Sequence, residues 1–403
     1  MISLDDLRAS PNALSGHYSA FHVGERLLLT GHSHQAWPDV AREGQLEAFD
    51  DASRLVDEKW ERAFAKAGRV RAGFGALLDD EAPVALAQNT HELVTRFLSA
   101  LDVRSRPRLV TSDGEFHTLR RQLARLDEEG LDVVRLEIEP VETLAERMGA
   151  EVDERTSAVL VSAVLFETAR IVPGLDALSE TCAESGAELL VDVYHALGAL
   201  PFTVREHGLE AAWIVGGGYK YLQLGEGNCF LRLPPHAETM RPVFTGWFAE
   251  FDELAAEHAA GRIGYSRGAS RFAGSTYDPT SNYRAARVLD FFVEQSLTSE
   301  LLREVSLHQT ELLARCVDEL QVAESVLTRD RATPRERFGG FLALESPHAE
   351  TIARELASEG VLTDARGRYL RLGPAPYLSD AQLEEAVERL AGVVERMGVL
   401  SRP

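Results

Sequence analysis

Short apolar runs alternate with longer amphipathic stretches between about residues 80 and 220. The run from Ser157 to Leu165 is apolar almost throughout, as expected of a strand that is buried on both faces. Further apolar runs predict strands near residues 26–30, 83–87, 108–111, 131–138, 188–192 and 211–215. Helical spacing of apolar residues predicts helices at residues 93–98, 119–129, 141–147 and 175–185. This alternation predicts an α/β fold whose mostly parallel, mixed sheet lies between helices.

The pattern differs on either side of this alternating region. A long helical region is predicted from residue 38 to about residue 78. Beyond about residue 280 the pattern predicts helices to residue 315, at 347–358 and at 379–397, with strands near 338–344, 360–362 and 369–372. We therefore predict three parts. They are an N-terminal segment (1–40) that packs with the small domain, a large domain (41–280), and a smaller C-terminal α+β domain (281–403).

Composition and charge exclude several classes of partner. The 403 residues are 45% hydrophobic and carry 42 basic against 64 acidic residues, a net charge of −22. Such an excess of acid argues against nucleic acid or an anionic membrane as partner. The sequence has no apolar run long enough to span a bilayer and no signal-peptide pattern at its start. Its three cysteines are widely spaced, so a reducing cytoplasm is the predicted location.

Polar residues gather where the predicted strands end. They are Asn89, Thr90, His117, Asp192, His195 and Lys220. Ligands of parallel sheets bind at the carboxyl ends of the strands, so this coincidence predicts a binding site. His32 and His34 lie in the loop after the first strand, but no third ligand lies near them in sequence. We therefore expect that loop to line a substrate site, and we expect no metal.

Lys220 is one of only three lysines in a chain that uses arginine for nearly all of its positive charge. A desolvated lysine can lose its proton and become an amine nucleophile, whereas arginine cannot. Alternatively, Lys220 is a strand-end lysine whose amine reaches solvent. Asp192 follows apolar residues, where a carboxylate is costly to bury unless paired, although it could simply cap the next helix.

One kind of cofactor would use both residues. A pyridine aldehyde would bind Lys220 covalently, while Asp192 would keep its ring nitrogen protonated. The helix start at Asn89 and Thr90 would hold a phosphate, unless Asn89 is an ordinary N-cap. Phe116 or His117 would stack on the ring.

Several motifs together resemble those of a known family. They are Asp192-Val193-Tyr194-His195, Gly218-Tyr219-Lys220-Tyr221, Gly225-Glu226-Gly227, Gly246-Trp247-Phe248, Gly360-Val361-Leu362-Thr363-Asp364 and Leu370-Arg371-Leu372-Gly373-Pro374-Ala375-Pro376-Tyr377. From about residue 27 to residue 395 the chain resembles the class V aminotransferase superfamily of fold type I enzymes that depend on pyridoxal 5'-phosphate. Within that superfamily it is most similar to the kynureninase group.

The resemblance implies a role for each matching residue. Lys220 would be the Schiff-base lysine, Asp192 would pair with the pyridinium nitrogen, and His195 would lie beside it. Tyr219 would contact the phosphate and relay protons. The remaining implied residues are Asn89, Thr90, Phe116, His117, Trp247 and Thr276 for the cofactor, and Arg371, His32 and His34 for the substrate. Trp247 and Thr276 would reach the phosphate of a partner subunit, so the resemblance implies a homodimer with a shared active site.

The sequence departs from the kynureninase pattern in three loops. Its first loop reads His32-Ser33-His34-Gln35 instead of Asn-Ser-Leu-Gly, and Phe116-His117-Thr118-Leu119 replaces Phe-Pro-Ser-Asp. The segment Glu115-Phe116-His117 instead resembles the stacking-histidine form of other class V members. A third loop reads Glu167-Thr168-Ala169-Arg170. These loops would face the substrate side chain, so the resemblance predicts the cofactor better than the reaction.

Three functions remain open from the sequence. The leading hypothesis is a kynureninase-like hydrolase that cleaves a Cβ–Cγ bond of a kynurenine-type amino acid. The second is another class V reaction on a different amino acid, by an aminotransferase, an epimerase or a β-lyase. A cysteine desulfurase is disfavoured because the late cysteine, Cys316, lies in a predicted helix. The third hypothesis is a non-catalytic or nucleotide-binding α/β protein, but the chain lacks a glycine-rich fingerprint and a P-loop lysine.

Overall fold

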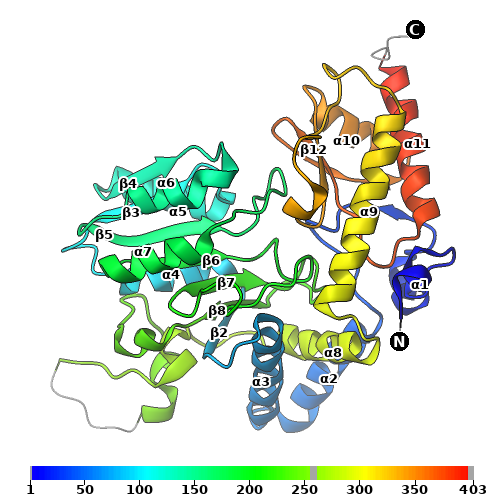
Figure 1. Ribbon diagram of the computed structural model, residues 1–403. Coiled ribbons are helices and arrows are strands. Elements are labelled where there is room, and N and C mark those ends of the chain that lie inside the picture. Colours follow the sequence, from blue (N-terminus) through cyan, green and yellow to red (C-terminus); the bar gives the residue numbers. More distant parts are fainter. Residues whose placement is uncertain (1, 255–260, 398–403) are drawn as a thin grey trace.

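The computed structural model describes residues 2–254 and 261–397, so the parts of the predicted domains at residues 1, 255–260 and 398–403 lie outside the described residues. A seven-stranded sheet forms one half of the molecule (Figure 1). Its strands, in spatial order, are β2 (Val84–Ala87), β8 (Cys229–Arg232), β7 (Trp213–Gly217), β6 (Glu188–Asp192), β5 (Thr156–Ser162), β3 (Arg108–Ser112) and β4 (Asp132–Leu136).

The sheet is mixed in the way the sequence predicts. Strands β7, β6, β5, β3 and β4 run parallel, whereas β8 is antiparallel to both β7 and β2. The sequence pattern missed β8, whose four residues follow a glycine-containing loop. The predicted fold class is confirmed.

Helices cover both faces of the sheet. Alternate residues of β5 contribute to separate cores: Val159 and Val161 pack with α6 and α7, while Ala158 and Leu160 pack with α4 and α5. All seven residues of β5 are buried, which explains its unbroken apolar run. These helices are α4 (Thr90–Ala100), α5 (His117–Glu128), α6 (Leu144–Ala150) and α7 (Leu175–Ser185), with the 3-10 helix η2 (Val141–Thr143) before α6.

The long helical region near the N-terminus consists of two helices, α2 (Val40–Leu55) and α3 (Lys59–Leu78). They are separated at Val56, which has a φ of 53° and donates its N–H to the carbonyl of Ala52. A β-branched residue seldom adopts that conformation, so periodicity alone could not place the break. Helix α8 (Thr280–Glu294) packs against both α2 and α3, as Figure 1 shows below the sheet.

The C-terminal part contains a second, antiparallel sheet of order β11-β12-β9. Its elements are α9 (Ser299–Glu319), β9 (Leu342–Glu345), α10 (Ala349–Ser358), β10 (Val361–Leu362), β11 (Asp364–Arg366), β12 (Tyr369–Leu372) and α11 (Asp380–Arg396). Strand β1 (Leu27–Leu28) from the N-terminal segment pairs in parallel with β10. The short strands β10 and β11 lie where the sequence predicts one strand at most.

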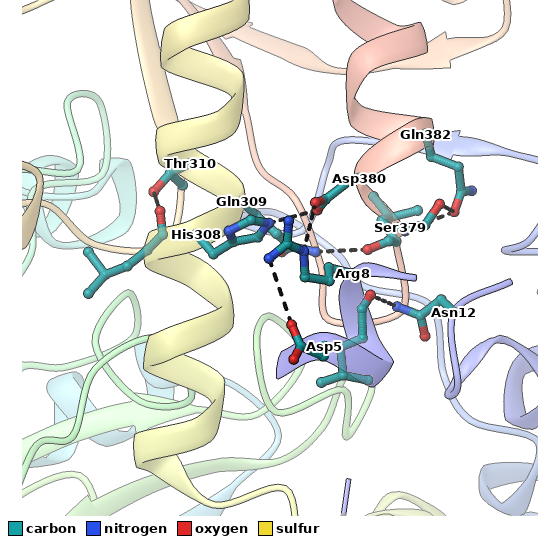
Figure 2. A network of polar contacts seen from close by, with 12 residues as sticks. Asp5, Arg8, Asn12, His308, Gln309, Thr310, Ser379, Asp380 and Gln382 are labelled. Atoms are coloured by element: carbon teal, nitrogen blue, oxygen red, sulfur yellow. Dashed lines mark hydrogen bonds and ion pairs between the residues drawn. The ribbon is translucent and has the colours of Figure 1, made fainter. Parts of the chain in front are cut away.

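The N-terminal segment also contacts the long helices of this part. Helix α1 (Leu4–Arg8) places Arg8 against Asp380, with Nε 3.2 Å from Oδ2, while His308 Nε2 lies 2.7 Å from Oδ1 of the same carboxylate. Asn12 donates to the carbonyl of Pro376 at 2.9 Å. Figure 2 shows Arg8 of α1 and His308 of α9 meeting at Asp380, the first residue of α11. Among the described residues, no helix combines the length and apolar character that a membrane crossing requires.

The remaining local elements are short 3-10 helices. They are η1 (Ser15–Phe21), η3 (Pro235–Thr239), η4 (Trp247–Glu253), η5 (Gly268–Phe272) and η6 (Arg335–Arg337). Aromatic residues of η4 pack against α3: Phe248 and Phe251 both contact the ring of Phe64.

Candidate active site

A cavity of about 460 Å³ lies at the carboxyl ends of β5 and β6, between the start of α4 and the loop after β7. Most of the predicted cofactor residues line it. They are Asn89, Thr90, Phe116, Asp192, His195, Tyr219 and Lys220. The parallel strands bring these residues together because their carboxyl ends meet at the same edge of the sheet.

Lys220 is buried beside this cavity, with 6% of its surface exposed. Its Nζ lies 2.6 Å from His195 Nε2, 4.9 Å from the ring centre of Tyr194 and 5.5 Å from that of Phe116. Burial lowers the pKa of Lys220 to about 7, although the charge of Asp192 acts in the opposite direction. Much of this lysine is therefore a neutral amine near pH 7, and its amine does not extend into solvent.

Asp192 is the last residue of β6 and lines the same cavity. The N–H of Tyr194 donates to its Oδ1 at 2.8 Å, and Oδ2 has no hydrogen bond among the described residues. Burial raises the pKa of Asp192, while that hydrogen bond and the charge of Lys220 lower it. Oδ2 is thus available to a cationic donor that enters the cavity.

His195 faces Lys220 from the turn after β6. Burial lowers the pKa of His195 well below its ordinary value, and the charge of Lys220 acts in the same direction, so the imidazole is neutral. Its Nδ1 atom is buried and has no hydrogen-bond partner within the described part of the chain. A neutral imidazole whose Nε2 is unprotonated can accept a hydrogen bond from the lysine amine.

The structure separates the two residues that could stack on a ring. Phe116 is half-buried and lines the cavity, whereas His117, the first residue of α5, is exposed. His117 Nδ1 lies 2.7 Å from Nη2 of Arg120 on the following turn. Of these two residues, Phe116 is therefore the one whose ring is available to a ligand in this cavity.

The first turn of α4 faces the cavity through Asn89 and Thr90. Asn89 is the N-cap, since its Oδ1 accepts the N–H of Glu92 at 3.0 Å. The side chain of Asn89 is thus an ordinary N-cap, which is one of the two roles that the sequence left open. The other free N–H groups and the positive end of the helix dipole remain available to an anion.

His34 stacks on Tyr219, which lines the cavity. Their rings stack with centres 4.8 Å apart and planes inclined by 17°. His34 Nε2 also lies 3.5 Å from Oε1 of Glu226, which lines the cavity. His34 thus lies beside the predicted cofactor residues, although it comes from the N-terminal loop.

His32, by contrast, is buried in a cluster with Asp364 and Arg371. Arg371 donates Nε and Nη2 to the two oxygens of Asp364 at 2.9 and 2.6 Å, and its Nη1 donates to the carbonyl of Phe166. His32 Nε2 lies 2.8 Å from Oδ1 of Asp364. The guanidinium that the resemblance assigns to a substrate carboxylate is therefore already paired with a carboxylate of its own chain.

In this cluster Asp364 carries one negative charge, Arg371 carries one positive charge, and His32 carries none. Burial lowers the pKa of His32 to about 4, against the effect of Asp364, so His32 is neutral. Burial acts to raise the pKa of Asp364, but hydrogen bonds from His32 and Arg371 hold it well below its usual range. His32 Nδ1 is buried without a partner in the part of the chain that the structure describes.

Replacement of Arg371 by leucine is expected to lower the free energy of unfolding of the cofactor-free protein by about 3–5 kcal/mol, because Asp364 would keep its charge without the buried partner. Arg366 offers a matched control, since it contacts the same carboxylate at 3.5 Å with its side chain 42% exposed. Arg366→Leu should cost less than about 1 kcal/mol. Urea unfolding of both variants measures the difference, and equal losses would contradict this account of the cluster.

Trp247 and Thr276 do not reach the cavity of their own chain. Trp247 Nε1 donates to Thr276 Oγ1 at 3.3 Å, and both residues are exposed. Thr276 lines a second cavity of about 540 Å³, which shares Gln88 and Gly227 with the first. A role for the pair in a partner subunit stays a prediction.

Sequence reasoning missed several polar residues of this site, among them Glu115 and Ser162. Ser162 ends β5 and lines the cavity, and the buried Glu115 hydrogen-bonds to it. The available signal was Ser162 itself, a serine inside an otherwise apolar run. Glu115 gave no such signal, since an acidic residue in a turn is usually exposed.

The side chains at the cavity fit pyridoxal phosphate. A buried amine, an open carboxylate oxygen, an aromatic face and a helix N-terminus match its aldehyde, ring nitrogen, ring and phosphate. The orphaned Nδ1 of His195 marks a further polar atom that a ligand can satisfy. Among the described residues, no group of three or more potential metal ligands was found.

Comparison with known proteins agrees with this geometry. The kynureninase C-terminal domain family matches residues 302–390. Kynureninase from Pseudomonas fluorescens is 29% identical over 259 residues, which cover 62% of this chain and 59% of that enzyme. Kynureninase from Burkholderia mallei (strain SAVP1) is 26% identical over 249 residues, covering 60% and 57%. The chain thus spans less than three fifths of the length of each relative.

Solved structures share the fold at low sequence identity. The cysteine desulfurase CsdA from Escherichia coli has a TM-score of 0.76 and 15% identity, with full coverage of both chains. A C-DES mutant with glycine covalently linked to its PLP cofactor has a TM-score of 0.80 and 13% identity, covering 93% of this chain and 98% of that one. The predicted resemblance is confirmed: in fold the chain is similar to class V, fold type I enzymes, and in sequence it is similar to kynureninases.

Proposed function

We propose that this protein is a kynureninase-like hydrolase that cleaves the Cβ–Cγ bond of a kynurenine-type amino acid. In more general terms it is a pyridoxal phosphate-dependent enzyme that acts on an amino acid, in agreement with its kynureninase relatives. The observation that carries the proposal is the buried Lys220 amine, which shares one cavity with the Asp192 carboxylate. The finer assignment rests on sequence similarity to kynureninases.

Each side chain of the cavity has a defined task in this proposal. Lys220 would bind the cofactor covalently and later remove the α-proton of the substrate, for which a pKa of about 7 is well matched. Asp192 Oδ2 would keep the ring nitrogen protonated, and Phe116 would pack on the ring face. When bound, the cofactor supplies an electron sink for the charge that develops at the α-carbon.

Other residues would bind and orient the reactants. The first turn of α4 would bind the phosphate through its backbone N–H groups. Tyr219 would lie against the cofactor and carry protons, with His34 stacked on its outer face. Arg371 would bind the substrate carboxylate, which requires either its remaining N–H groups or a rearrangement of its pairing with Asp364.

The protein loaded with pyridoxal phosphate is expected to convert kynurenine into anthranilate and alanine. Anthranilate is fluorescent, so its release can be followed continuously, and alanine can be quantified at the end point. The same protein without added cofactor and a Lys220→Ala variant are the controls. Loaded protein that forms neither product would refute the hydrolase assignment while leaving the cofactor assignment intact.

A second candidate is another class V reaction on a different amino acid: transamination, epimerisation or β-elimination. The first loop favours keeping it, because His34 stands where the kynureninase pattern has an aliphatic side chain and stacks on Tyr219 of the cavity. Cys316 lies within α9, which continues to disfavour a cysteine desulfurase. Formation of pyridoxamine phosphate from a panel of amino acids would identify a transaminase.

The assembly and location of the protein are also proposals. A homodimer is supported by the exposed Trp247–Thr276 pair, which lies outside the cavity of its own chain and could serve that of a partner. A cytoplasmic location is supported by the absence of paired cysteines among the described residues. The proposed domain division is supported by the separate antiparallel sheet of the C-terminal part.

A further inference from the structure

Glu115 is a completely buried carboxyl group whose hydrogen bonds come from the two strands beside it. Its Oε1 lies 2.8 Å from Ser112 Oγ and accepts the Ser162 N–H at 3.2 Å. Its Oε2 lies 2.6 Å from Ser162 Oγ. An ionised carboxylate can only accept hydrogen bonds, so in that state both hydroxyl groups donate to Glu115.

Ser162 connects this buried carboxyl to the cofactor cavity. It is the last residue of β5, it lines the cavity, and it pairs in register with Asp192 on β6. While its hydroxyl proton points toward Glu115, the serine oxygen can offer only a lone pair to the cavity. A cavity group that meets Ser162 must then be a donor.

The environment of Glu115 allows two protonation states near neutral pH. Burial raises the pKa of Glu115 to about 7, the hydrogen bonds from Ser162 and Ser112 lower it, and the charge of Asp192 on β6 raises it further. In the protonated state the carboxyl needs an acceptor. If Ser162 becomes that acceptor, its own proton is free to turn toward the cavity.

We propose that Glu115 is a positioning residue that acts through the Ser162 hydroxyl and makes this wall of the cavity, next to Asp192, a hydrogen-bond acceptor. The inference rests on the proposed function, because it concerns the cavity that would hold pyridoxal phosphate. It adds a residue that touches neither cofactor nor substrate but determines what Ser162 offers to them. Glu115 and Asp192 together make this end of the cavity favourable to a cationic, donating ligand.

The test uses the protein reconstituted with pyridoxal phosphate, followed by its visible absorption band as a function of pH. Glu115→Gln removes the negative charge of the carboxylate and offers an amide donor to Ser162. It is therefore expected to lower the pH at the midpoint of the change in the visible band by about 0.5–1 unit. Ser162→Ala is expected to lower it similarly. In a protein that already carries Ser162→Ala, Glu115→Gln should shift the midpoint by less than half of the shift that it causes in the wild type. The reason is that the Glu115 carboxyl and the Ser162 hydroxyl act as one unit.

Asp113→Asn is the matched control. Asp113 is an exposed carboxylate in the same loop, and it accepts the N–H of Ile138 at 3.0 Å without contacting Ser162. This variant should leave the titration midpoint unchanged. If Glu115→Gln does not fold, as judged by circular dichroism, Ser162→Ala alone carries the test, since it leaves Glu115 in place.

The outcomes separate this inference from the proposed function. A wild-type protein that gains no visible band with pyridoxal phosphate overturns both. Normal loading of the wild type with an unchanged midpoint in Glu115→Gln, or in Ser162→Ala, overturns the inference alone. A full-sized Glu115→Gln shift in the Ser162→Ala background also overturns it, because the carboxylate would then act through its charge and not through the hydroxyl.

Discussion

Replacement of Lys220 by alanine is expected to abolish covalent loading with pyridoxal phosphate and to lower turnover by at least about 10³-fold. Lys220 has the one amine that the structure places in the cavity, within the residues that it describes. Loss of that amine removes both the covalent attachment and the proposed acceptor of the α-proton, each of which contributes separately. Absorption spectra of the reconstituted variant and its turnover of kynurenine measure the two losses.

The other lysines offer a control for this substitution. Lys66 lies on α3, where its amine contacts Glu47 at 2.7 Å, and Lys66→Ala should load and turn over like the wild type.

The rate of cofactor loading should rise with pH through a midpoint near 7, because the neutral form of Lys220 is the nucleophile. A Lys220→Ala variant that keeps a reducible covalent adduct would disprove the assignment.

Replacement of Asp192 by asparagine is expected to reduce turnover by roughly 10²–10³-fold, the size typical of removing one fixed charge opposite a developing charge. The variant keeps the shape of the side chain and the hydrogen bond from Tyr194 to its oxygen. It cannot hold a proton on the ring nitrogen by charge. Steady-state turnover, together with the dissociation constant for pyridoxal phosphate, separates this effect from a failure to bind.

The stability of Asp192→Asn provides an independent check. A buried acid whose pKa is raised in the folded state costs stability once the pH exceeds its unfolded value of about 4, so the cofactor-free variant should be no less stable than the wild type at pH 7. Glu188 lies at the opposite end of the same strand and bonds to Trp213 and His236. Glu188→Gln should leave turnover unchanged. Wild-type turnover by Asp192→Asn would remove this residue from the proposed mechanism.

Much of the site could be predicted because a parallel sheet gathers its strand ends. The apolar runs define the strands, and the polar residue after each run is then placed at one edge, which brought Asn89, Asp192 and Lys220 together correctly. The rare Lys220 and the isolated carboxylate of Asp192 indicated the chemistry of a pyridine aldehyde cofactor. The two four-residue strands show how little so short a segment determines, since β2 was predicted and β8 was missed.

Contacts between distant segments could not be predicted in this way. Whether Phe116 or His117 faces the cavity depends on where α5 begins, because the side chains of neighbouring residues at a helix start point in different directions. Arg371 pairs with Asp364 because the β11–β12 hairpin sets these two residues opposite each other in register. Sequence spacing alone does not determine that register.

The sequence by itself determined the alternating α/β fold and the types of side chain that a pyridine aldehyde cofactor requires, because both follow from local pattern and residue chemistry. Only the tertiary structure decided the charge states and partners of those side chains. Lys220 is near-neutral and Glu115 can be protonated near pH 7 because surrounding segments exclude water from both. Desolvation and through-space charge depend on atoms that lie far apart in the chain, and only folding brings them within a few ångströms of each other.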